Sequence, residues 1–401
     1  MRNIILLLAL AFLLRFPALA APALDAPGLD ANAAPLPGDF WSKPLSPQGQ
    51  APEGWPENER SLAPEDCGEC HARQYEEWRS SLHAKAFSPG LAGQLMTSLA
   101  NSPQDCMQCH APLAEQEEAF RMALKEGRAH EASAQGLAAA GNSCSGCHLR
   151  EHRRYGPPQA ESGETGQSNS EASHGGVFRS PDFEKSSFCG ACHQFPPSWG
   201  TVNGKALENT HEEWKVSPQA KKGITCQSCH MPGRKHMWRG IHDPEMTASG
   251  LTPAFKPDAE KARFILTNTG VGHAFPTYVT PKAVMRTVRL DNNLAPIKES
   301  EVSLIIQRAV SFTGGRWVEA FDTRLFPNQS AVLNIQWGLS DNVSMWLDVY
   351  PDDFYDHQVY DGLLKTLSGE AKKLIAQADA DASNSAYRLF ETIVKRPRKK
   401  Q

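Results

Sequence analysis

The sequence predicts a mixed fold: a mainly helical and irregular part is followed by an antiparallel β-sandwich-like domain and C-terminal helices. Three observations lead to this prediction. All ten cysteines of the chain lie in five regularly spaced clusters within residues 67–229. After residue 251 no further cluster occurs, and short alternating runs rich in β-branched residues take over. From Tyr355 to about Ile393 the apolar spacing returns to a helical period, which predicts helices packed on the sheet or on the N-terminal part.

Each cluster is a Cys-x-x-Cys-His motif, the attachment signature of c-type haem. Two thiols of such a motif bind one porphyrin, and the adjacent histidine is the proximal ligand of its iron. A single copy is also compatible with a redox dithiol or half a zinc site, but five copies that use every cysteine favour haem. The sequence therefore predicts five covalently attached haem c groups and no disulfide. The five motifs are Cys67, Cys70 and His71; Cys106, Cys109 and His110; Cys144, Cys147 and His148; Cys189, Cys192 and His193; and Cys226, Cys229 and His230.

The N-terminus has the pattern of a secretory signal. Arg2 supplies a positive charge, residues 4–14 form an apolar run, and Ala18-Leu19-Ala20 is a small-residue cleavage site. The run is shorter than the roughly 20 residues of a membrane-spanning helix, so an uncleaved anchor is the less favoured alternative. No cysteine precedes Cys67 to carry a lipid anchor. Residues 1–20 are thus expected to be a cleaved signal peptide and the mature protein to be periplasmic or otherwise exported.

The charge balance gives little reason to expect a nucleic-acid partner. The formal net charge is −4, and each haem would add two propionates, so the holoprotein is expected to be more acidic. The basic run from Lys395 to Lys400 is expected to be a solvated tail, with contact to a membrane surface or an acidic partner as the alternative. The expected partners are redox proteins that donate and accept electrons, and the sequence leaves the oligomeric state open.

Composition divides the rest of the chain into four parts. Residues 21–60 are rich in Ala and Pro and are expected to form an extended lead-in rather than a packed element. Residues 61–252 form the predicted pentahaem cytochrome c domain, in which short helices and loops wrap around five c-type haems. Residues 253–352 form the β-sandwich-like domain, and residues 353–401 form a C-terminal helical segment with the basic tail.

Local patterns predict several individual elements. In the first part we expect helices over His71–Phe87, where Tyr75, Trp78 and Leu82 form an apolar stripe, over Leu113–Leu124, and from Glu212 to just before Pro218. The segment Gly156–Gly175 is predicted to be a surface loop. In the second part the predicted strands are 263–266, 283–290, 302–312, 317–325, 331–336 and 343–349.

The function depends on what occupies the sixth coordination position of each iron, because a second histidine closes it and an open position admits small molecules. Nine of the 14 histidines lie outside the motifs. An unbroken helix would hold His71 and His83 about 18 Å apart, so His83 is expected to serve a different haem. His236 and His242 follow a Pro-Gly breaker and are expected to reach two separate irons. His273, between Gly272 and Ala-Phe-Pro, is expected to cross from the β-rich part to the haems.

The remaining histidines are weaker candidates. His130 follows a charged run, His152 lies in a basic cluster and His357 lies in an acidic stretch. These three are expected to be solvated. His211 is left undecided.

The chain resembles the multihaem cytochromes of the cytochrome c-554/c-552 family over about residues 61–280. The resemblance is carried by Tyr75, Trp78, Ser81 and His83 after the first motif, by the fourth and fifth motifs with Phe195 and Pro232, by His236-Met-Trp-Arg-Gly-Ile-His242-Asp-Pro, and by Gly272-His273-Ala-Phe-Pro-Thr277. It implies that His83, His174, His236, His242 and His273 are distal ligands. His211 stands where such relatives are expected to have an aromatic residue.

The sequence favours an exported pentahaem electron carrier with mostly bis-His haems. The alternative is an oxidoreductase that acts on a small nitrogen or sulfur compound, or on peroxide, at one open haem. Pentahaem nitrite reductases are a poor match, because their active haem is attached through Cys-x-x-Cys-Lys and all five motifs here end in histidine. A third hypothesis is that the β-rich part docks the cytochrome onto a partner, although a stabilising lid is the simpler role for it.

Overall fold

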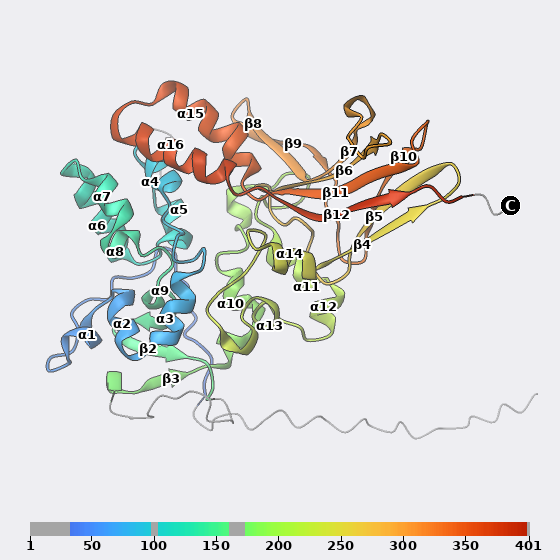
Figure 1. Ribbon diagram of the computed structural model, residues 1–401. Coiled ribbons are helices and arrows are strands. Elements are labelled where there is room, and N and C mark those ends of the chain that lie inside the picture. The colour runs from blue at the N-terminus through green and yellow to red at the C-terminus, as the bar shows by residue number, and fades with distance from the viewer. Residues whose placement is uncertain (1–32, 98–102, 160–172, 399–401) are drawn as a thin grey trace, which may run out of the picture.

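The computed structural model describes residues 33–97, 103–159 and 173–398. The predicted signal peptide and most of the predicted loop 156–175 lie outside these ranges. Figure 1 shows two parts side by side. One consists mainly of short helices, and the other consists of long strands, which include the last strand of the chain. Among the residues that are described, no helix has the length and apolarity needed to cross a membrane.

The helices of the first part are short, and each is joined to the next by a tight turn or an irregular segment. Their bounds are α1 (Glu57–Arg60), α2 (Pro64–Cys70), α3 (Ala72–Arg79), α4 (Pro89–Leu95), α5 (Pro103–His110), α6 (Ala114–Lys125), α7 (Ala129–Ala134), α8 (Gly136–Ala139), α9 (Cys144–His148), α10 (Ser186–Gly190), α11 (Thr210–Lys215), α12 (Pro218–Lys221), α13 (Cys226–His230) and α14 (Pro244–Ser249). A small sheet, β1 (Leu149–Arg150), β2 (Arg153–Gly156) and β3 (Val177–Arg179), lies among them.

The second part contains two antiparallel sheets and a separate hairpin. One sheet has the order β10–β5–β4, the other has the order β12–β11–β6–β7, and β8 pairs with β9. The bounds are β4 (Leu251–Pro257), β5 (Lys261–Asn268), β6 (Lys282–Leu290), β7 (Val302–Ile306), β8 (Arg308–Thr313), β9 (Arg316–Asp322), β10 (Ser330–Gln336), β11 (Asn342–Tyr350) and β12 (Tyr387–Lys395).

The two larger sheets form a sandwich because each presents one apolar face to the other. Strand β5 alternates strictly, with Ala262, Phe264 and Leu266 buried and their neighbours partly exposed. These side chains share one core with Met285 of β6 and Leu347 of β11. The predicted antiparallel, sandwich-like arrangement of this region therefore agrees with the structure.

The C-terminal helices pack on the helical part and not on the sandwich. α15 (Asp361–Thr366) and α16 (Gly369–Ser383) follow a π-helical turn over Tyr355–Tyr360. Leu374 of α16 enters the apolar core that contains Phe87 and Phe120. Gly93 of α4 lies so close to α16 that a Cβ atom there would be 2.9 Å from Ile375. A glycine thus permits the close approach of these two helices.

The prediction that helix continues to about Ile393 was wrong, because the chain forms strand β12 from Tyr387 and pairs it with β11. A bulge in that pairing, where Phe390 has φ 56°, interrupts the two-residue alternation that identifies a strand. Strand β4 was also missed; prolines stand at positions 253 and 257 within it.

Two further predictions differ from the structure in the extent of an element, and a third differs in how the segment packs. The predicted helix 71–87 ends at Arg79, and turns continue to residue 87. The predicted strand 302–312 is divided at Gln307, because β7 pairs with β6 and β8 leaves that sheet to pair with β9. The lead-in has little regular structure, as expected, but it is packed: Phe40 is buried against Tyr155 and Phe188.

Arg308 joins the β-rich part to the helical part. Its side chain is fully buried and pairs with Glu319 at 2.7 Å. Its guanidinium also donates to the backbone carbonyls of Ala206 and Leu207, which belong to the segment between the fourth and fifth motifs. A buried charge of this kind is stable only while its partners remain in place.

We expect Arg308→Leu to lower the free energy of unfolding by about 3–5 kcal/mol, because it removes the buried cation that pairs with Glu319 and leaves the carbonyls of Ala206 and Leu207 without this donor. Thermal and denaturant unfolding of the holoprotein would measure this loss. The matched control is Arg316→Leu at an exposed position of the same hairpin, with an expected effect within about 0.5 kcal/mol. Equal effects of the two substitutions would show that Arg308 does not connect the two parts.

Candidate haem-binding site

Each Cys-x-x-Cys-His motif lies on or directly after a short helix. The motifs are found at α2, α5, α9, α10 and α13, with His71 following α2 as its C-cap. Residues three and four positions apart share one face of a helix. Where the motif is helical, its first cysteine, second cysteine and histidine are therefore presented to the same side, as attachment to one planar group requires. In the fourth motif α10 ends at Gly190, and Cys192 and His193 lie in the turn that follows it.

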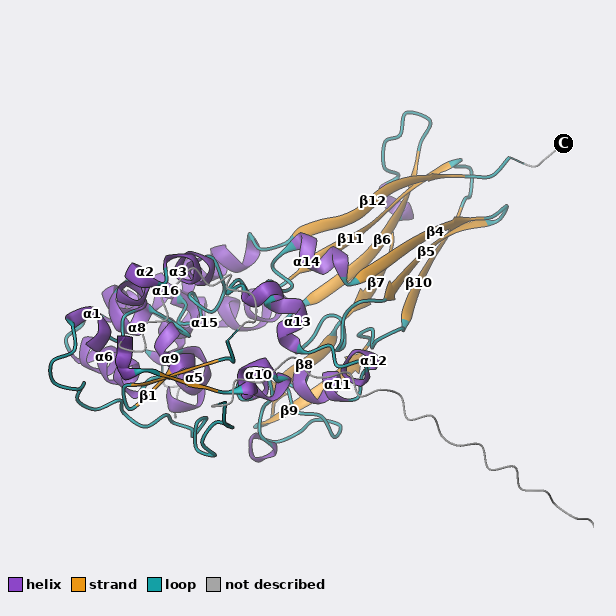
Figure 2. Cartoon of the chain, turned by 90° about the horizontal axis from the view of Figure 1, so that it is seen from below, coloured by secondary structure: helices purple, strands orange, loops and turns teal. Residues whose placement is uncertain are grey.

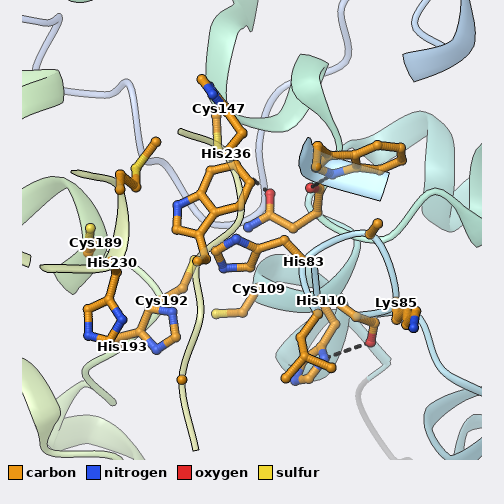
Figure 3. Close-up of a pocket in the computed structure, with 18 of the residues that line it drawn as sticks. His83, Lys85, Cys109, His110, Cys147, Cys189, Cys192, His193, His230 and His236 are labelled. Atoms are coloured by element: carbon orange, nitrogen blue, oxygen red, sulfur yellow. Dashed lines mark hydrogen bonds between the residues drawn. The ribbon is translucent and has the colours of Figure 1, made fainter. Parts of the chain in front are cut away.

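All five motifs open into one cavity of about 3020 Å³. Its lining contains all ten cysteines, the five motif histidines, and His83, His174, His236, His242 and His273. Figure 3 shows thiols and imidazoles from several of these motifs converging on this space. Divided among five groups, the volume is about 600 Å³ each, within the range of roughly 300–1,000 Å³ for one bound ligand. The cavity therefore has room for five haem-sized groups.

Four motif histidines each face a second histidine across this cavity. The ring centroids are 6.3 Å apart for His71 and His174, 6.3 Å for His148 and His236, 6.2 Å for His193 and His83, and 6.5 Å for His230 and His273. A ligating nitrogen lies about 2 Å from its metal and about 1.1 Å from its own ring centroid, so two rings on one metal have centroids about 6.2 Å apart. The four pairs have the spacing that bis-His coordination of an iron requires.

Hydrogen bonds select the nitrogen that each ring presents. Nδ1 lies 2.8 Å from the carbonyl oxygen of Tyr155 in His148, 2.6 Å from that of Arg239 in His230, and 2.9 Å from that of Ala274 in His273. A carbonyl oxygen accepts a hydrogen bond from Nδ1–H, so the proton stays on Nδ1 and the lone pair on Nε2 is left for a metal. His110 has the same arrangement, with Nδ1 2.9 Å from the oxygen of Ala86.

Two carboxylates hold the segments that carry distal histidines. Glu59 accepts a hydrogen bond from the backbone nitrogen of His174 at 2.9 Å and lies 3.3 Å from its Nδ1. Glu77 accepts from the backbone nitrogen of His236 at 2.8 Å. Such outer contacts fix the orientation of a ligating ring. Our sequence reasoning did not identify Glu59 or Glu77, because each is distant in sequence from the histidine that it orients.

The distal rings are also held neutral. Burial, with smaller contributions from neighbouring imidazoles, lowers the pKa of His83 to about 3. Burial likewise lowers the pKa of His236 to about 4 and that of His273 to about 4. Only the neutral ring has a lone pair for a metal, so these environments favour ligation over protonation.

Histidine 273 is carried into the cavity by contacts between the two parts of the molecule. The carboxylate of Glu213 in α11 accepts a hydrogen bond from the backbone nitrogen of Ala274 at 3.2 Å. The same carboxylate pairs with the buried Arg324 at 2.9 Å. The crossing expected for His273 is thus found, and a buried ion pair stabilises it.

The second motif differs from the other four. The described residues include all 14 histidines, and among them no ring contact joins His110 to another histidine. His242, the remaining predicted distal ligand, lines the cavity but faces no motif histidine. Its Nε2 lies 2.9 Å from a carboxylate oxygen of Asp352, so the nitrogen that would bind iron is engaged elsewhere. His242 forms no ring pair with a motif histidine, and its assignment as an axial ligand remains a prediction.

The four weaker histidines do not line the cavity. His130 and His357 are exposed, as expected. His152 is buried, contrary to expectation, and its Nε2 lies 3.1 Å from the carbonyl oxygen of Gly49 in the lead-in. His211 packs against Trp214, with ring centroids 5.6 Å apart.

Thiols of different motifs lie close enough to shift one another's pKa. A hydrogen bond with Cys144 lowers the pKa of the Cys67 thiol. A hydrogen bond with Cys192 lowers the pKa of Cys109 to about 7, and one with Cys189 lowers the pKa of Cys226 to about 7. The first motif therefore adjoins the third, the second adjoins the fourth, and the fourth adjoins the fifth. The attachment sites form clusters rather than isolated positions along the chain.

Comparisons with known proteins show which proteins this chain is similar to. A sequence comparison with curated proteins finds no match. The crystal structure of a penta-heme cytochrome c552 from Thermochromatium tepidum has a similar fold, with a TM-score of 0.56 and 18% sequence identity over 78% of this chain and 96% of the other. The family described as cytochrome c554 and c-prime matches residues 66–135, which contain the first two motifs. The family match is confined to the first two motifs, and the structural likeness, at 18% identity, shows a shared fold. Both findings support haem c as the group that the Cys-x-x-Cys-His motifs bind.

Replacement of a distal histidine should open one iron of the cytochrome. We expect His273→Ala to add one high-spin iron per chain, because the Nε2 atom facing His230 is removed, whereas His242→Ala should add none. Electron paramagnetic resonance of the oxidised holoprotein measures both. His130→Ala, at the surface, is the control that should leave the spectrum unchanged. A new high-spin signal from His242→Ala, with none from His273→Ala, would contradict the assignment of the pairs.

Proposed function

We propose that this cytochrome is an exported pentahaem electron carrier whose irons are mostly bis-His coordinated. The four histidine pairs at 6.2–6.5 Å are the observation that carries the proposal. When bound, each haem supplies an iron that accepts and releases one electron. A second histidine on the same iron excludes substrate from it, so a site closed on both faces suits electron transfer rather than catalysis.

The protein has three tasks in such a carrier. The cysteines fix the position of each group covalently, the histidine pairs close both faces, and the carbonyl and carboxylate partners hold the rings still. Rigid, closed ligation keeps the structural change on oxidation small. The contacts between thiols join the first motif to the third, and the second and the fifth to the fourth. An electrostatic interaction of Cys189 with Cys147 connects these two groups, which supports a continuous arrangement.

Export follows from the same chemistry and remains a proposal. The apolar N-terminal run and its small-residue cleavage site provide the signal. Covalent haem attachment in bacteria takes place outside the cytoplasmic membrane. The redox partners would then be other exported or membrane-surface proteins.

The holoprotein is expected to contain five haems per chain, all of which are reduced and reoxidised reversibly. Haemochrome spectroscopy against protein concentration gives the count, and a potentiometric titration gives the reversibility. Cys144→Ala with Cys147→Ala should lower the count to four, while His130→Ala should leave it at five. A count below five in the unaltered, exported protein would contradict the proposal.

A second function, small-molecule redox chemistry at the second motif, is favoured by a specific observation. His110 faces no histidine, and two half-buried tyrosines of the cavity lining, Tyr278 and Tyr355, interact electrostatically with Cys106. Burial raises the pKa of both tyrosines above its usual value, so they remain protonated hydrogen-bond donors. The backbone nitrogen of Tyr355 donates to the carbonyl of Asp352, the residue that binds His242. Donor and proton-carrying groups thus gather beside the one motif without a paired histidine.

The oxidised protein should therefore show one high-spin iron among five, together with four low-spin irons. Addition of nitrite, hydroxylamine or peroxide should alter the high-spin signal and leave the low-spin signals unchanged, because four irons are closed on both faces. Electron paramagnetic resonance before and after each addition is the measurement. If all five irons are low-spin, the second function is excluded and the carrier function alone remains.

A further inference from the structure

Positive charge is concentrated around the fifth motif. The stretch from Trp214 to Arg239 contains six basic residues and no acidic residue, although the whole chain has a net charge of −4. The basic residues are Lys215, Lys221, Lys222, Arg234, Lys235 and Arg239. The stretch from Glu53 to Arg79, which surrounds the first motif, has the opposite balance, with eight acidic and three basic residues. The fifth motif therefore differs from the first in the sign of its surroundings.

Two of the basic residues, Lys215 and Lys221, lie at the ends of helices that precede the motif, and the others lie in the segments just after α12 and α13. α11, α12 and α13 follow one another in the chain, and they are neighbours in both views of the molecule (Figures 1 and 2). The indole nitrogen of Trp214 in α11 donates to the carbonyl of Ile224, two residues before Cys226, at 3.0 Å. The backbone nitrogen of Ile224 donates to Gln219 in α12, also at 3.0 Å. These bonds hold the C-terminal ends of α11 and α12 next to the haem attachment site.

Half of this charge is not neutralised within the protein. Lys215 pairs with Glu212 at 3.3 Å, Arg234 with Glu184 at 2.5 Å, and Arg239 with Asp243 at 3.5 Å. Lys221, Lys222 and Lys235 are exposed, and within the described part of the chain no carboxylate lies within ion-pair distance of them. Three unpaired ammonium groups thus flank the motif in the sequence, with Lys221 and Lys222 before Cys226 and Lys235 after His230.

An exposed apolar side chain on the same segment favours contact with a protein. Val216, next to Lys215, has 71% of its surface exposed. Cys229 is exposed as well, so the edge of a group bound to it would lie at the surface. We call the set Lys215, Val216, Lys221, Lys222, Cys229 and Lys235 the motif-five surface. This surface combines an exposed apolar side chain, Val216, with the haem-attachment residue Cys229 and with basic side chains. A transient protein interface has this kind of composition.

We propose that an acidic electron-transfer protein docks on the motif-five surface. This inference rests on the proposed electron-carrier function and names the class of partner for it. Opposite charge steers such a partner to the redox edge and raises the association rate, typically by 10–10³-fold. In the exchange one electron passes from the reduced partner, which is oxidised, to this cytochrome, which is reduced, and no covalent bond forms or breaks. An anionic membrane fits less well, because α12 has four residues and forms no amphipathic membrane-surface helix.

The test measures reduction of the oxidised, full-length holoprotein by a reduced plant-type [2Fe–2S] ferredoxin, an acidic donor with a potential of about −400 mV. Stopped-flow absorbance gives the second-order rate constant between about 10 mM and 1 M salt, where the Debye length falls from about 30 Å to about 3 Å. The rate constant is expected to fall at least about tenfold over this range.

The variant Lys221→Glu/Lys222→Glu/Lys235→Glu is expected to lower the low-salt rate constant by at least about tenfold and to match the unaltered protein at high salt. The control variant Lys256→Glu/Lys372→Glu/Lys373→Glu makes the same change in net charge at exposed positions away from the motif-five surface. It should lower the rate constant much less. Equal slowing by both variants, or no slowing by the first, would overturn the proposal.

Two further readouts separate the ways in which the proposal can fail. Both variants should keep five haems and be fully reduced by dithionite; if the unaltered protein does not, the electron-carrier function itself is wrong. If five haems are present but ferredoxin reduction does not depend on salt, the docking inference alone is wrong. A membrane is the other possible occupant of this surface. It would be supported if the unaltered protein binds phosphatidylserine vesicles, the first variant does not, and reduction by ferredoxin does not depend on salt. That combination would overturn the inference.

Discussion

The structure depends on one constraint: a histidine from a distant segment must stand opposite a motif histidine with room for an iron between them. This geometry is met four times, and every pair joins parts of the chain that are far apart in sequence. His83, which follows the first motif, faces the fourth motif, and His236, which follows the fifth, faces the third. The chain is therefore interlocked through its cofactor sites, and the short helices between them need little core of their own.

The same constraint explains why a sandwich without a haem motif belongs to the molecule. His273 lies at its edge, and its position depends on the buried pair of Glu213 and Arg324. Arg308 adds a second buried connection to the segment before the fifth motif. Both arginines have partners in the helical part, so the sandwich can be described as a scaffold for His273, the proposed distal ligand. A stabilising role of this kind requires no external partner for the sandwich itself.

The sequence was most informative where chemistry demands a fixed local spacing. Covalent attachment needs two cysteines and a histidine within one helical turn, so the motif residues could be found directly. Alternation predicted most strands, whereas β12 was missed because a bulge at Phe390 breaks its period. The helix after His71 was predicted too long, yet the inference that His83 faces another motif agrees with the ring pair it forms with His193. The contact of His242 with Asp352 could not be predicted, because the two residues are 110 positions apart and no local pattern points to their proximity.

The most direct test is a crystal structure of the holoprotein with an anomalous difference map measured at the iron absorption edge. The account predicts five iron peaks, four of which lie midway between the rings of His71 and His174, His148 and His236, His193 and His83, and His230 and His273. The fifth should lie beside His110 with no second histidine on it. Fewer than five peaks, or iron positions away from these four pairs, would contradict the account.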